Sequence, residues 1–395
     1  MQSLGTTVDR GLEGVVVGTT ELSAVEGEAG RLSYRGFDIR DLAANATFEE
    51  VCYLLLFGQL PTAYQLEDLR VRLAANRAVP KPLIAWMESL PKDASPMTVL
   101  RTMVSALALF APRLADGAHA STPRAAIALI AKTPTLLAAW DRIRRGLPPL
   151  EPLPHLSTAA NFLYMRSGTS PIYEAERALD TYLVLLADHS FNASTFAARV
   201  TASTRADIYA SATTALATLE GELHGGAPSK VMAMLVEIGT PDRAGAYVRA
   251  LLERGERVMG MGHREYKVRD PRAEHLEVMA KSLGEAAGSK WYAIARALED
   301  AATAALAEAK PGRRICANVE FYTAPTLAGL GLPPDEFTCM FACARMAGWT
   351  AHVLEQLHDN RLIRPQAAYG GPATAAWTPI ERRGHSADAA ARPGN

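Results

Sequence analysis

Hydrophobic residues recur at helical spacing along most of this chain, and this pattern narrows the fold more than any motif. From about residue 38 onwards, apolar side chains return every three or four positions, which is the period of an amphipathic helix. We found neither strand–helix alternation nor a repeat of fixed length in the sequence. We therefore predict a fold that is nearly all α.

Local signals mark where several of these helices begin. Thr47 and Glu50 are spaced as in a capping box, in which each side chain bonds to the other residue's backbone N–H. Thr122-Pro123 and Thr240-Pro241 each combine an N-cap residue with a proline at the first helical position. Later in the chain, a 3.6-residue apolar period predicts a long buried helix that starts near Asp335.

Strand-like sequence is confined to residues 14–34. The valines of 15–17 and the segment 31–34 flank a turn-rich stretch at 26–30. This arrangement predicts a small antiparallel β-hairpin near the N-terminus, with residues 15–17 as its first strand.

Size and composition set limits on the class of protein. A chain of 395 residues is long for a single core, so we expect two domains. With 49% hydrophobic and 21% charged residues, the composition is that of an ordinary globular protein. The net charge of −1 gives no overall attraction to nucleic acid or to an anionic membrane. An acidic ligand would therefore need a local cluster of arginines.

Other bulk features favour a cytoplasmic protein without a membrane span. The first ten residues lack the basic start and apolar run of a secretory signal. Apolar runs such as 53–57 are much shorter than the roughly 20 residues that cross a bilayer. The four cysteines form no C-x-x-C pair, so we interpret them as packing residues.

Three widely separated segments carry acid–base or anion-binding groups. His224 precedes two glycines, and His263 follows a Gly-Met-Gly sequence; bare backbone of this kind lets a ligand approach closely. Asp270-Pro271 has the pattern of an N-cap followed by the first helical residue. It would place Arg272 in the first turn of a helix, where a carboxylate binds well. Glu320 lies among apolar residues, so we expect it to be partly desolvated and more basic than usual.

Several of these patterns have alternative interpretations. Arg345 lies in the long apolar helix, and a salt bridge to Glu355 or Asp359 would be a purely structural role for it. His352 and His358, with Glu355 between them, invite a zinc interpretation. However, they would sit about 60° apart around the helix and two turns from each other, unlike a zinc pair at i, i+4. We predict no metal site.

At these residues the chain resembles the citrate synthase family. The likeness covers nearly the whole sequence, and the order and spacing of its motifs are highly specific. Besides the three segments above, it rests on residues 25–27, 34–36, 48–61, 192–195 and 359–365.

The resemblance implies a helical homodimer that binds oxaloacetate and acetyl-CoA and needs no cofactor. Its large domain would comprise residues 1–225 and 332–380, and a small domain at 226–331 would close over the substrates. We expect residues 381–395 to form a disordered tail. Closure would complete the site and exclude water while a carbanion exists.

The resemblance also implies a role for each candidate residue. Glu320 would remove a proton from the methyl group of acetyl-CoA. His224 would donate a hydrogen bond to the thioester oxygen, and His263 would polarise the oxaloacetate carbonyl. Hydrolysis of the citryl thioester would complete the reaction. His189, Arg272 and Arg345 would bind the carboxylates of oxaloacetate, together with Arg364 from the other subunit. Lys267 would bind the CoA phosphates.

One departure from the family pattern leaves alternatives open. The family's base is usually aspartate, whereas this chain has Glu320, which is longer by one methylene group, or about 1.5 Å. A 2-methylcitrate synthase would use propionyl-CoA through the same groups. A paralogue without turnover, which only binds a dicarboxylate or CoA, is the alternative from a different class, and Glu320 alone supports it.

Overall fold

The computed structural model describes residues 11–12, 14–112, 121–263, 265–309, 312, 315–372 and 374–383. The chain divides into a main unit, residues 18–363, and a terminal unit that combines residues 1–17 with 364–395. In the terminal unit, Ile380–Arg382 forms one 3-10 turn, η4. Most of the tail that we predict to be disordered, residues 384–395, lies outside the described residues.

The prediction of an all-α fold is confirmed. Within the described residues there are sixteen α-helices, and 3-10 turns join some of them. The helices of the first half are α1 (Ile39–Asn45), α2 (Phe48–Phe57), α3 (Ala63–Asn76), α4 (Lys81–Ser89), α5 (Pro96–Leu107), α6 (Pro123–Arg144), α7 (Thr158–Ser167), α8 (Tyr173–Leu186), α9 (Ala193–Ser203) and α10 (Ile208–Leu219). Those of the second half are α11 (Ala227–Ile238), α12 (Ala244–Glu253), α13 (Pro271–Ala287), α14 (Trp291–Ala309), α15 (Val319–Gly329) and α16 (Phe337–His358). The 3-10 turns of the main unit are η1 (Ala108–Phe110), η2 (Pro241–Arg243) and η3 (Pro334–Glu336).

The N-terminal hairpin exists, but its first strand is not the one predicted. Strands β1 (Ser23–Glu26), β2 (Arg31–Tyr34) and β3 (Phe37–Asp38) form an antiparallel sheet in that order. The valines at 15–17 are outside it and exposed, so that part of the prediction is wrong. Glu26 pairs with Arg31 across a short turn. A strand at 15–17 would instead require a long loop, whose closure costs more entropy.

The predicted helix starts are largely confirmed. Thr47 and Glu50 form both bonds of a capping box at the start of α2. Thr122 accepts the N–H of Ala125 at the start of α6. At Thr240 the prediction is only partly right, because the turn η2 follows it and α12 begins at Ala244.

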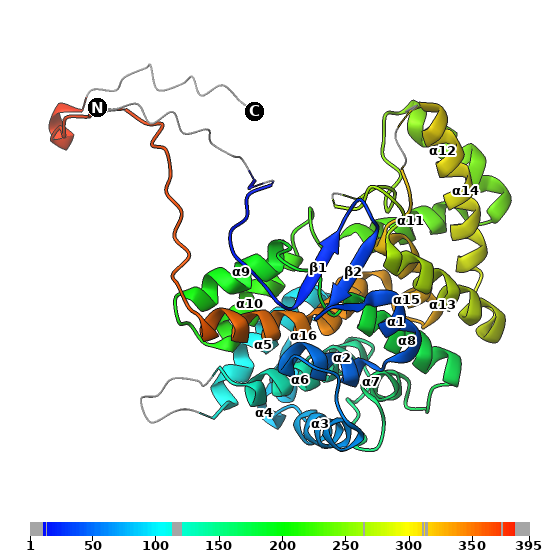
Figure 1. Ribbon diagram of the computed structural model, residues 1–395, viewed down its shortest axis with the longest axis horizontal. Helices are drawn as coiled ribbons and strands as arrows, with labels where there is room; N and C mark the ends of the chain where they lie inside the picture. Colours follow the sequence, from blue (N-terminus) through cyan, green and yellow to red (C-terminus); the bar gives the residue numbers. More distant parts are fainter. Residues whose placement is uncertain are drawn as a thin grey trace. The chain divides into compact units, whose positions relative to one another are not determined.

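Helix α16 is the centre of the main unit. Its 22 residues are almost all buried between α6, α8, α9 and α10, as the apolar period of the sequence predicts. Figure 1 shows it running across the body of the protein beneath the hairpin. A helix this apolar on every side must be covered all round, so it holds its few polar residues away from bulk water.

Helices α11 to α15 pack extensively on one another. Helix α13 contacts α15, and α12 contacts α14; Figure 1 shows the group together on the right. Helix α13 also packs against α8, which belongs to the other part of the main unit. The five helices span the predicted small domain at 226–331, and its separate movement stays a prediction.

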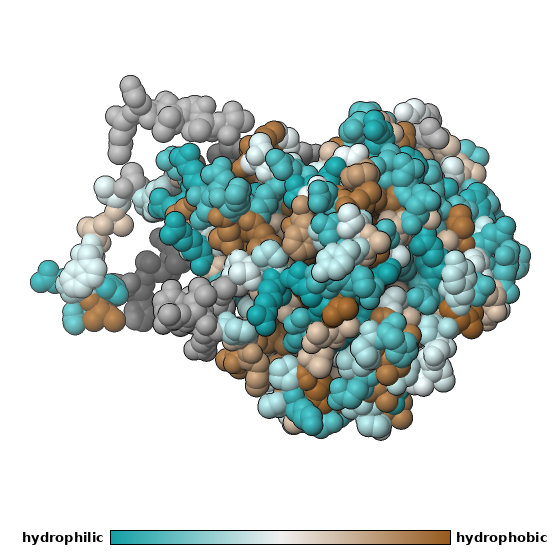
Figure 2. Space-filling model, turned by 60° about the horizontal axis from the view of Figure 1, so that its bottom comes forward, coloured by the Kyte–Doolittle hydropathy of each residue, from teal (hydrophilic) through white to brown (hydrophobic). Residues whose placement is uncertain are grey.

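The distribution of hydrophobic and polar residues on the surface agrees with the composition of an ordinary globular protein. On the face that Figure 2 presents, hydrophobic residues form scattered patches among polar ones. Of the four cysteines, which are all free, three are buried and Cys316 is half-buried, so packing is confirmed for those three. In the described part of the chain, no helix has both the length and the apolar character to cross a membrane.

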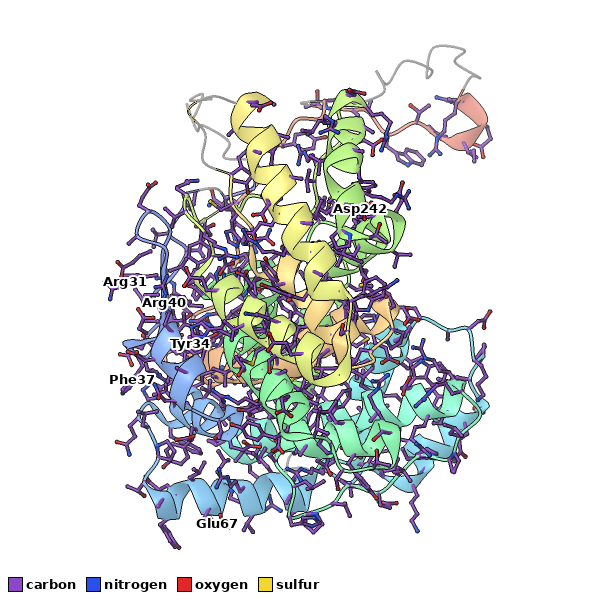
Figure 3. The ribbon with its side chains drawn as sticks, turned by 90° about the vertical axis from the view of Figure 1, so that its right-hand side faces the viewer. Arg31, Tyr34, Phe37, Arg40, Glu67 and Asp242 are labelled. Carbon is purple, nitrogen blue, oxygen red and sulfur yellow. The ribbon has the colours of Figure 1, made fainter. Side chains whose placement is uncertain are left out.

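The hairpin holds the loop that carries His263. The N–H of Lys267 donates to the carbonyl of Gly27 at 3.1 Å. A Cβ atom at Gly27 would lie 2.2 Å from the carbonyl oxygen of Glu265, so only glycine fits there. Figure 3 shows Arg31, Tyr34 and Arg40 gathered along this edge of the molecule.

We therefore expect Gly27→Ala to lower the free energy of unfolding by about 1–3 kcal/mol, because the added methyl group pushes the loop away. Chemical denaturation measures this change. Gly245→Ala is the control, since its Cβ has room within α12 and alanine favours a helix. Equal stability of the two variants would contradict the close packing of hairpin and loop.

Candidate active site

A buried ion pair between Asp270 and Arg272 lies at the start of α13. Asp270 is the N-cap of this helix, and its carboxylate accepts from Arg272 Nε at 3.0 Å and Nη2 at 2.7 Å. It also accepts the backbone N–H of Val319 at 3.1 Å. One carboxylate therefore connects the first turn of α13 to the first turn of α15.

The loop before α13 and the segment before α15 are joined by backbone hydrogen bonds. The N–H of Gly262 donates to Cys316 O at 2.7 Å, and that of Asn318 donates to Gly260 O at 2.9 Å. Gly260 has a φ of +76°, and its Cα approaches Phe321 so closely that a Cβ would lie 3.0 Å from the Phe321 backbone. Asn318 caps α15 by accepting the N–H of Glu320 at 3.1 Å. Glu320 is thus held, partly buried, in the first turn of α15.

His263, Tyr266 and His189 lie together on the other side of this loop. His263 Nδ1 accepts the backbone N–H groups of Glu265 at 3.0 Å and of Tyr266 at 3.2 Å. In a neutral ring the proton is then on Nε2, which is free to donate. The hydroxyl of Tyr266 is 3.2 Å from His189 Nε2, and the two histidine rings are 5.7 Å apart between centroids.

A buried network anchors the backbone that precedes His189. The Asp188 carboxylate accepts from the hydroxyl of Ser23 in β1 and lies 3.3 Å from His352 Nε2. The hydroxyl of Tyr34 in β2 contacts the Asp188 backbone carbonyl at 3.0 Å. The sheet and α16 therefore fix His189 from two sides.

The same network places the two histidines of the zinc interpretation in different surroundings. His352 is fully buried with Asp188 and Arg199 as its partners, whereas His358 is exposed. Among the described residues, no three His, Cys, Asp or Glu side chains are grouped so that they could hold a metal ion.

Arg345 is buried in α16 and does not form the predicted alternative, a salt bridge to Glu355 or Asp359. Its Nε donates to the carbonyl of Leu186 at 2.7 Å, and its guanidinium lies 4.8 Å from the Phe341 ring centroid. Glu355 pairs instead with Arg199, and Asp359 is exposed. Arg345 therefore keeps N–H groups that can bind an anionic ligand.

His224 is held in the turn after α10 by Ser194. Its Nε2 is 2.8 Å from Ser194 Oγ, which also accepts Trp349 Nε1–H at 3.1 Å. The Ser194 hydroxyl has two acceptors for its one hydrogen: His224 Nε2, and Asn192 Oδ1 at 2.8 Å. If the hydrogen points to His224, Nδ1–H of the imidazole is free to donate. Gly225 is tightly packed, because a Cβ there would lie 2.4 Å from Leu219 O.

Burial shifts the pKa of the carboxyl group and the pKa values of the imidazoles in opposite directions. It raises the pKa of Glu320 to about 7, with Arg272 opposing and Asp270 adding to the rise. Burial lowers the pKa of His224 and of His263 to about 4, with help from Arg345 and Arg272 respectively. The pKa of His189 is held well below its usual value by burial, Arg272 and Arg345. The imidazoles of the site are therefore neutral, whereas the raised pKa of the Glu320 carboxyl group lies near physiological pH.

The electrostatic effects of the arginines on these pKa values show which predicted residues the fold brings together. Arg272 acts on His189, His263 and Glu320, and Arg345 acts on His189 and His224. Lys267 is exposed on the same loop and contributes to the lowered pKa of His263. Arg364 is exposed and belongs to the terminal unit.

Three residues of the site were not predicted. Tyr266 is 3% exposed and contacts His189, but nothing in the sequence distinguishes it from a core tyrosine. Asp270 was recognised as an N-cap and not as the partner of Arg272, although the spacing of two residues was a usable signal. Ser194 was noted only within a motif, and its contact with His224 joins residues 30 positions apart.

The fold is helical, and the candidate site combines a carboxyl group of raised pKa, neutral imidazoles and buried arginines, a set of groups that suits acid–base chemistry on an acidic ligand. A family model described as "Citrate synthase, C-terminal domain" matches residues 11–366. The chain therefore belongs to the citrate synthase family.

Individual relatives agree with this assignment. The chain is 45% identical to citrate synthase 2 of Bacillus subtilis, over 95% of this chain and 100% of that protein. It is 40% identical to a 2-methylcitrate synthase of Mycobacterium tuberculosis, over 92% and 91%. The structure is similar to that of a citrate synthase from Thermoplasma acidophilum in a ternary complex with carboxymethyl coenzyme A and oxaloacetate. The TM-score is 0.87 at 32% sequence identity, over 95% of this chain and 100% of that one.

We expect the rings of His224 and His263 to stay neutral from pH 8 down to about pH 5, because their protonated forms are disfavoured until the pH approaches about 4. Ring carbon and proton NMR shifts, followed against pH, measure this directly. The urea-unfolded chain is the reference, in which histidines titrate near pH 6.5. Titration of either ring above pH 6 in the folded protein would contradict the electrostatics described here.

Proposed function

We propose that this chain condenses acetyl-CoA with oxaloacetate and hydrolyses the resulting citryl-CoA to citrate and CoA. The observation that carries the proposal is the position of Glu320. This carboxyl group has a pKa raised to about 7 and lies within the electrostatic influence of Arg272, an arginine that can bind a carboxylate substrate. Family membership supports the same reaction.

In the proposed first step, the Glu320 carboxylate takes a proton from the methyl group of acetyl-CoA. A raised pKa makes this carboxylate a stronger base than an ordinary one. The negative charge moves to the thioester oxygen, where Nδ1–H of His224 would donate a hydrogen bond. This role requires the Ser194 hydroxyl to point at His224 Nε2, so Ser194 sets the tautomer.

In the second step, the carbanion attacks the keto carbon of oxaloacetate. His263 would polarise this carbonyl through Nε2–H and pass its proton to the oxygen as the bond forms. Its Nδ1 already accepts two backbone N–H groups, which orients the ring for this task. Arg272, Arg345 and His189 would hold the carboxylates, and guanidinium groups suit them because they bind carboxylates through two parallel bonds.

The sizes of the free-energy contributions explain why the histidines matter as much as the base. The α-proton of a thioester is far less acidic than a carboxylic acid, so a lone carboxylate cannot remove it at a useful rate. An oxyanion donor supplies about 3–4 kcal/mol, and holding both reactants in register supplies roughly 7–11 kcal/mol more. The proposed site has groups for both contributions.

The remaining parts of the proposal concern assembly and closure. The region 226–331 would move as a small domain and close over the substrates, with Lys267 binding the CoA phosphates. Arg364 would enter the site of the other subunit of a homodimer. Acetyl-CoA is a substrate here, and the reaction needs no further cofactor. We place it in the cytoplasm.

We expect Glu320→Gln to reduce the rate of CoA release from acetyl-CoA by at least about a thousandfold, because an amide cannot accept the proton. Glu320→Asp should retain or raise activity, since aspartate is the usual base of the family. Thiol release with both substrates saturating measures the rate. Unchanged activity of the Gln variant would rule out Glu320 as the base.

We also expect kcat/KM for acetyl-CoA to be constant above about pH 7 and to fall about tenfold for each pH unit below it. The sign follows because Glu320 must be ionised to act, and its raised pKa moves protonation up to this range. Oxaloacetate is kept saturating throughout. A fall centred near pH 4.5 would show that the Glu320 carboxyl is not shifted in the working enzyme.

Mixing two inactive variants tests the contribution of Arg364. A hybrid dimer of Arg364→Ala and Glu320→Gln subunits has one site with an intact glutamate and an intact arginine from the partner. Random mixing of equal amounts should therefore restore about a quarter of the wild-type activity. If Arg364 served its own subunit, every site in the mixture would lack one group and no activity would return.

A second candidate function differs from the first only in the acyl group that the CoA thioester carries. The 2-methylcitrate synthase relative, at 40% identity, favours testing propionyl-CoA. One methylene group changes binding by only about 1–3 kcal/mol, so overlap between the two substrates is expected. The ratio of kcat/KM for acetyl-CoA and propionyl-CoA decides between them.

A further inference from the structure

A second group of cationic residues lines a cavity distinct from the residues discussed above. The cavity has a volume of about 430 Å³ and lies between the ends of α6 and α7 and the connection from α15 to α16. Four of its lining side chains are cationic and one is anionic: Lys92, Arg144, Arg145, Arg166 and Asp141. Gly331 and Pro333 complete the wall.

The arginines of this cavity are held in place by carboxyl groups, of which Asp141 and Glu336 are buried and Asp335 is half-exposed. Arg145 Nη2 and Arg166 Nε both donate to the same Asp141 oxygen, at 2.6 Å and 3.2 Å. Arg144 donates to Asp335 at 2.6 Å and to Glu336 at 2.7 Å. The guanidinium groups are therefore fixed before any ligand arrives, which lowers the entropy cost of binding.

These carboxyl groups leave some N–H donors of the cations without a strong acceptor. Each guanidinium has five N–H donors, and Arg145 is 46% exposed at its side chain. Arg166 directs Nη1 and Nη2 at the carbonyl of Gly331 over 3.4 Å each, which are long and weak bonds. A stronger acceptor in the cavity would compete well for these donors.

A buried acid lies beside the cations of this cavity. Glu336 is fully buried; Arg144 Nη2 donates to its Oε1 at 2.7 Å, and Arg166 Nη2 lies 3.4 Å from its Oε2. Burial raises the pKa of Glu336 to about 8, with Arg166 opposing and Asp141 adding to the rise. Glu336 takes up part of the cationic charge whenever it is ionised, and the four cations still outnumber the one anionic side chain that lines the cavity.

We propose that this cavity binds a phosphate-bearing anion, such as a pyrophosphate group. Cations reach the cavity from the loop after α4, from α6 and from α7, so they approach a ligand from several directions. A phosphate presents acceptor oxygens on all sides, whereas a carboxylate presents only one edge. Arginine and lysine are both strong phosphate ligands.

The cavity borders the connection between two helices that carry proposed site residues. Gly331 and Pro333 belong to the segment that joins α15, which starts beside Glu320, to α16, which contains Arg345. Arg166 bonds to the Gly331 carbonyl, so a bound anion shares its donors with this connection.

Calorimetric titration of the full-length protein with sodium pyrophosphate tests the proposal. Excess citrate is present throughout, so that pyrophosphate does not occupy the residues around Arg272. The test variant is the double substitution Lys92→Gln and Arg145→Gln. The matched control, Lys81→Gln with Arg124→Gln, removes the same charges near the opposite ends of α4 and α6. Thermal melting checks that both variants fold.

We expect wild-type protein and control to bind pyrophosphate equally and the test variant to bind at least tenfold more weakly. Lys92→Gln alone should weaken binding about threefold, which keeps the test valid if the double variant is unstable. Equal affinity in all proteins, equal weakening in both double variants, or absence of binding to the wild type would overturn the proposal. None of these results depends on turnover, so the proposed reaction is tested separately.

Discussion

The buried pair of Asp270 and Arg272 is the interaction on which the candidate site depends. Asp270 is 1% exposed and Arg272 is 3% exposed, and neither charge would be tolerated there alone. Because Asp270 also takes the N–H of Val319, the pair fixes the distance between the starts of α13 and α15. The cation that would bind substrate and the carboxylate that would act as base are therefore placed by one residue.

Burial gives this site its chemical character without any unusual side chain. The same exclusion of water raises the pKa of a carboxyl group and lowers that of an imidazole, because it penalises whichever form is charged. Glu320 and His263 respond in these opposite directions. The fixed positive charge is left to the guanidinium groups, which stay ionised. Proton transfer and anion binding are thereby assigned to different residue types.

The periodicity of the sequence predicts the helical fold correctly, whereas the roles of the candidate site residues stay predictions. The apolar period predicts α16 correctly. Of the glycines near the two histidines, Gly225 and Gly260 are tightly packed against Leu219 and Phe321, and the approach of a ligand to this backbone stays a prediction. The first strand of the hairpin was placed wrongly, because valine content says nothing about register, which the turn determines. Tyr266 was missed because its role comes from a contact with His189, 77 positions away. Local patterns do not contain such pairings.

The anchoring of Asp188 by the hairpin has a consequence for how the chain acquires its final shape. Ser23 in β1 meets Asp188 across 165 positions, and Gly27 meets Lys267 across a still longer interval. Contacts of this kind form slowly, because large loops must close first. During synthesis at about 5–20 residues per second, the hairpin waits roughly ten to thirty seconds for residue 188 to be made. We therefore expect the region of the candidate site to be among the last parts of the molecule to become ordered, after the local helices around it.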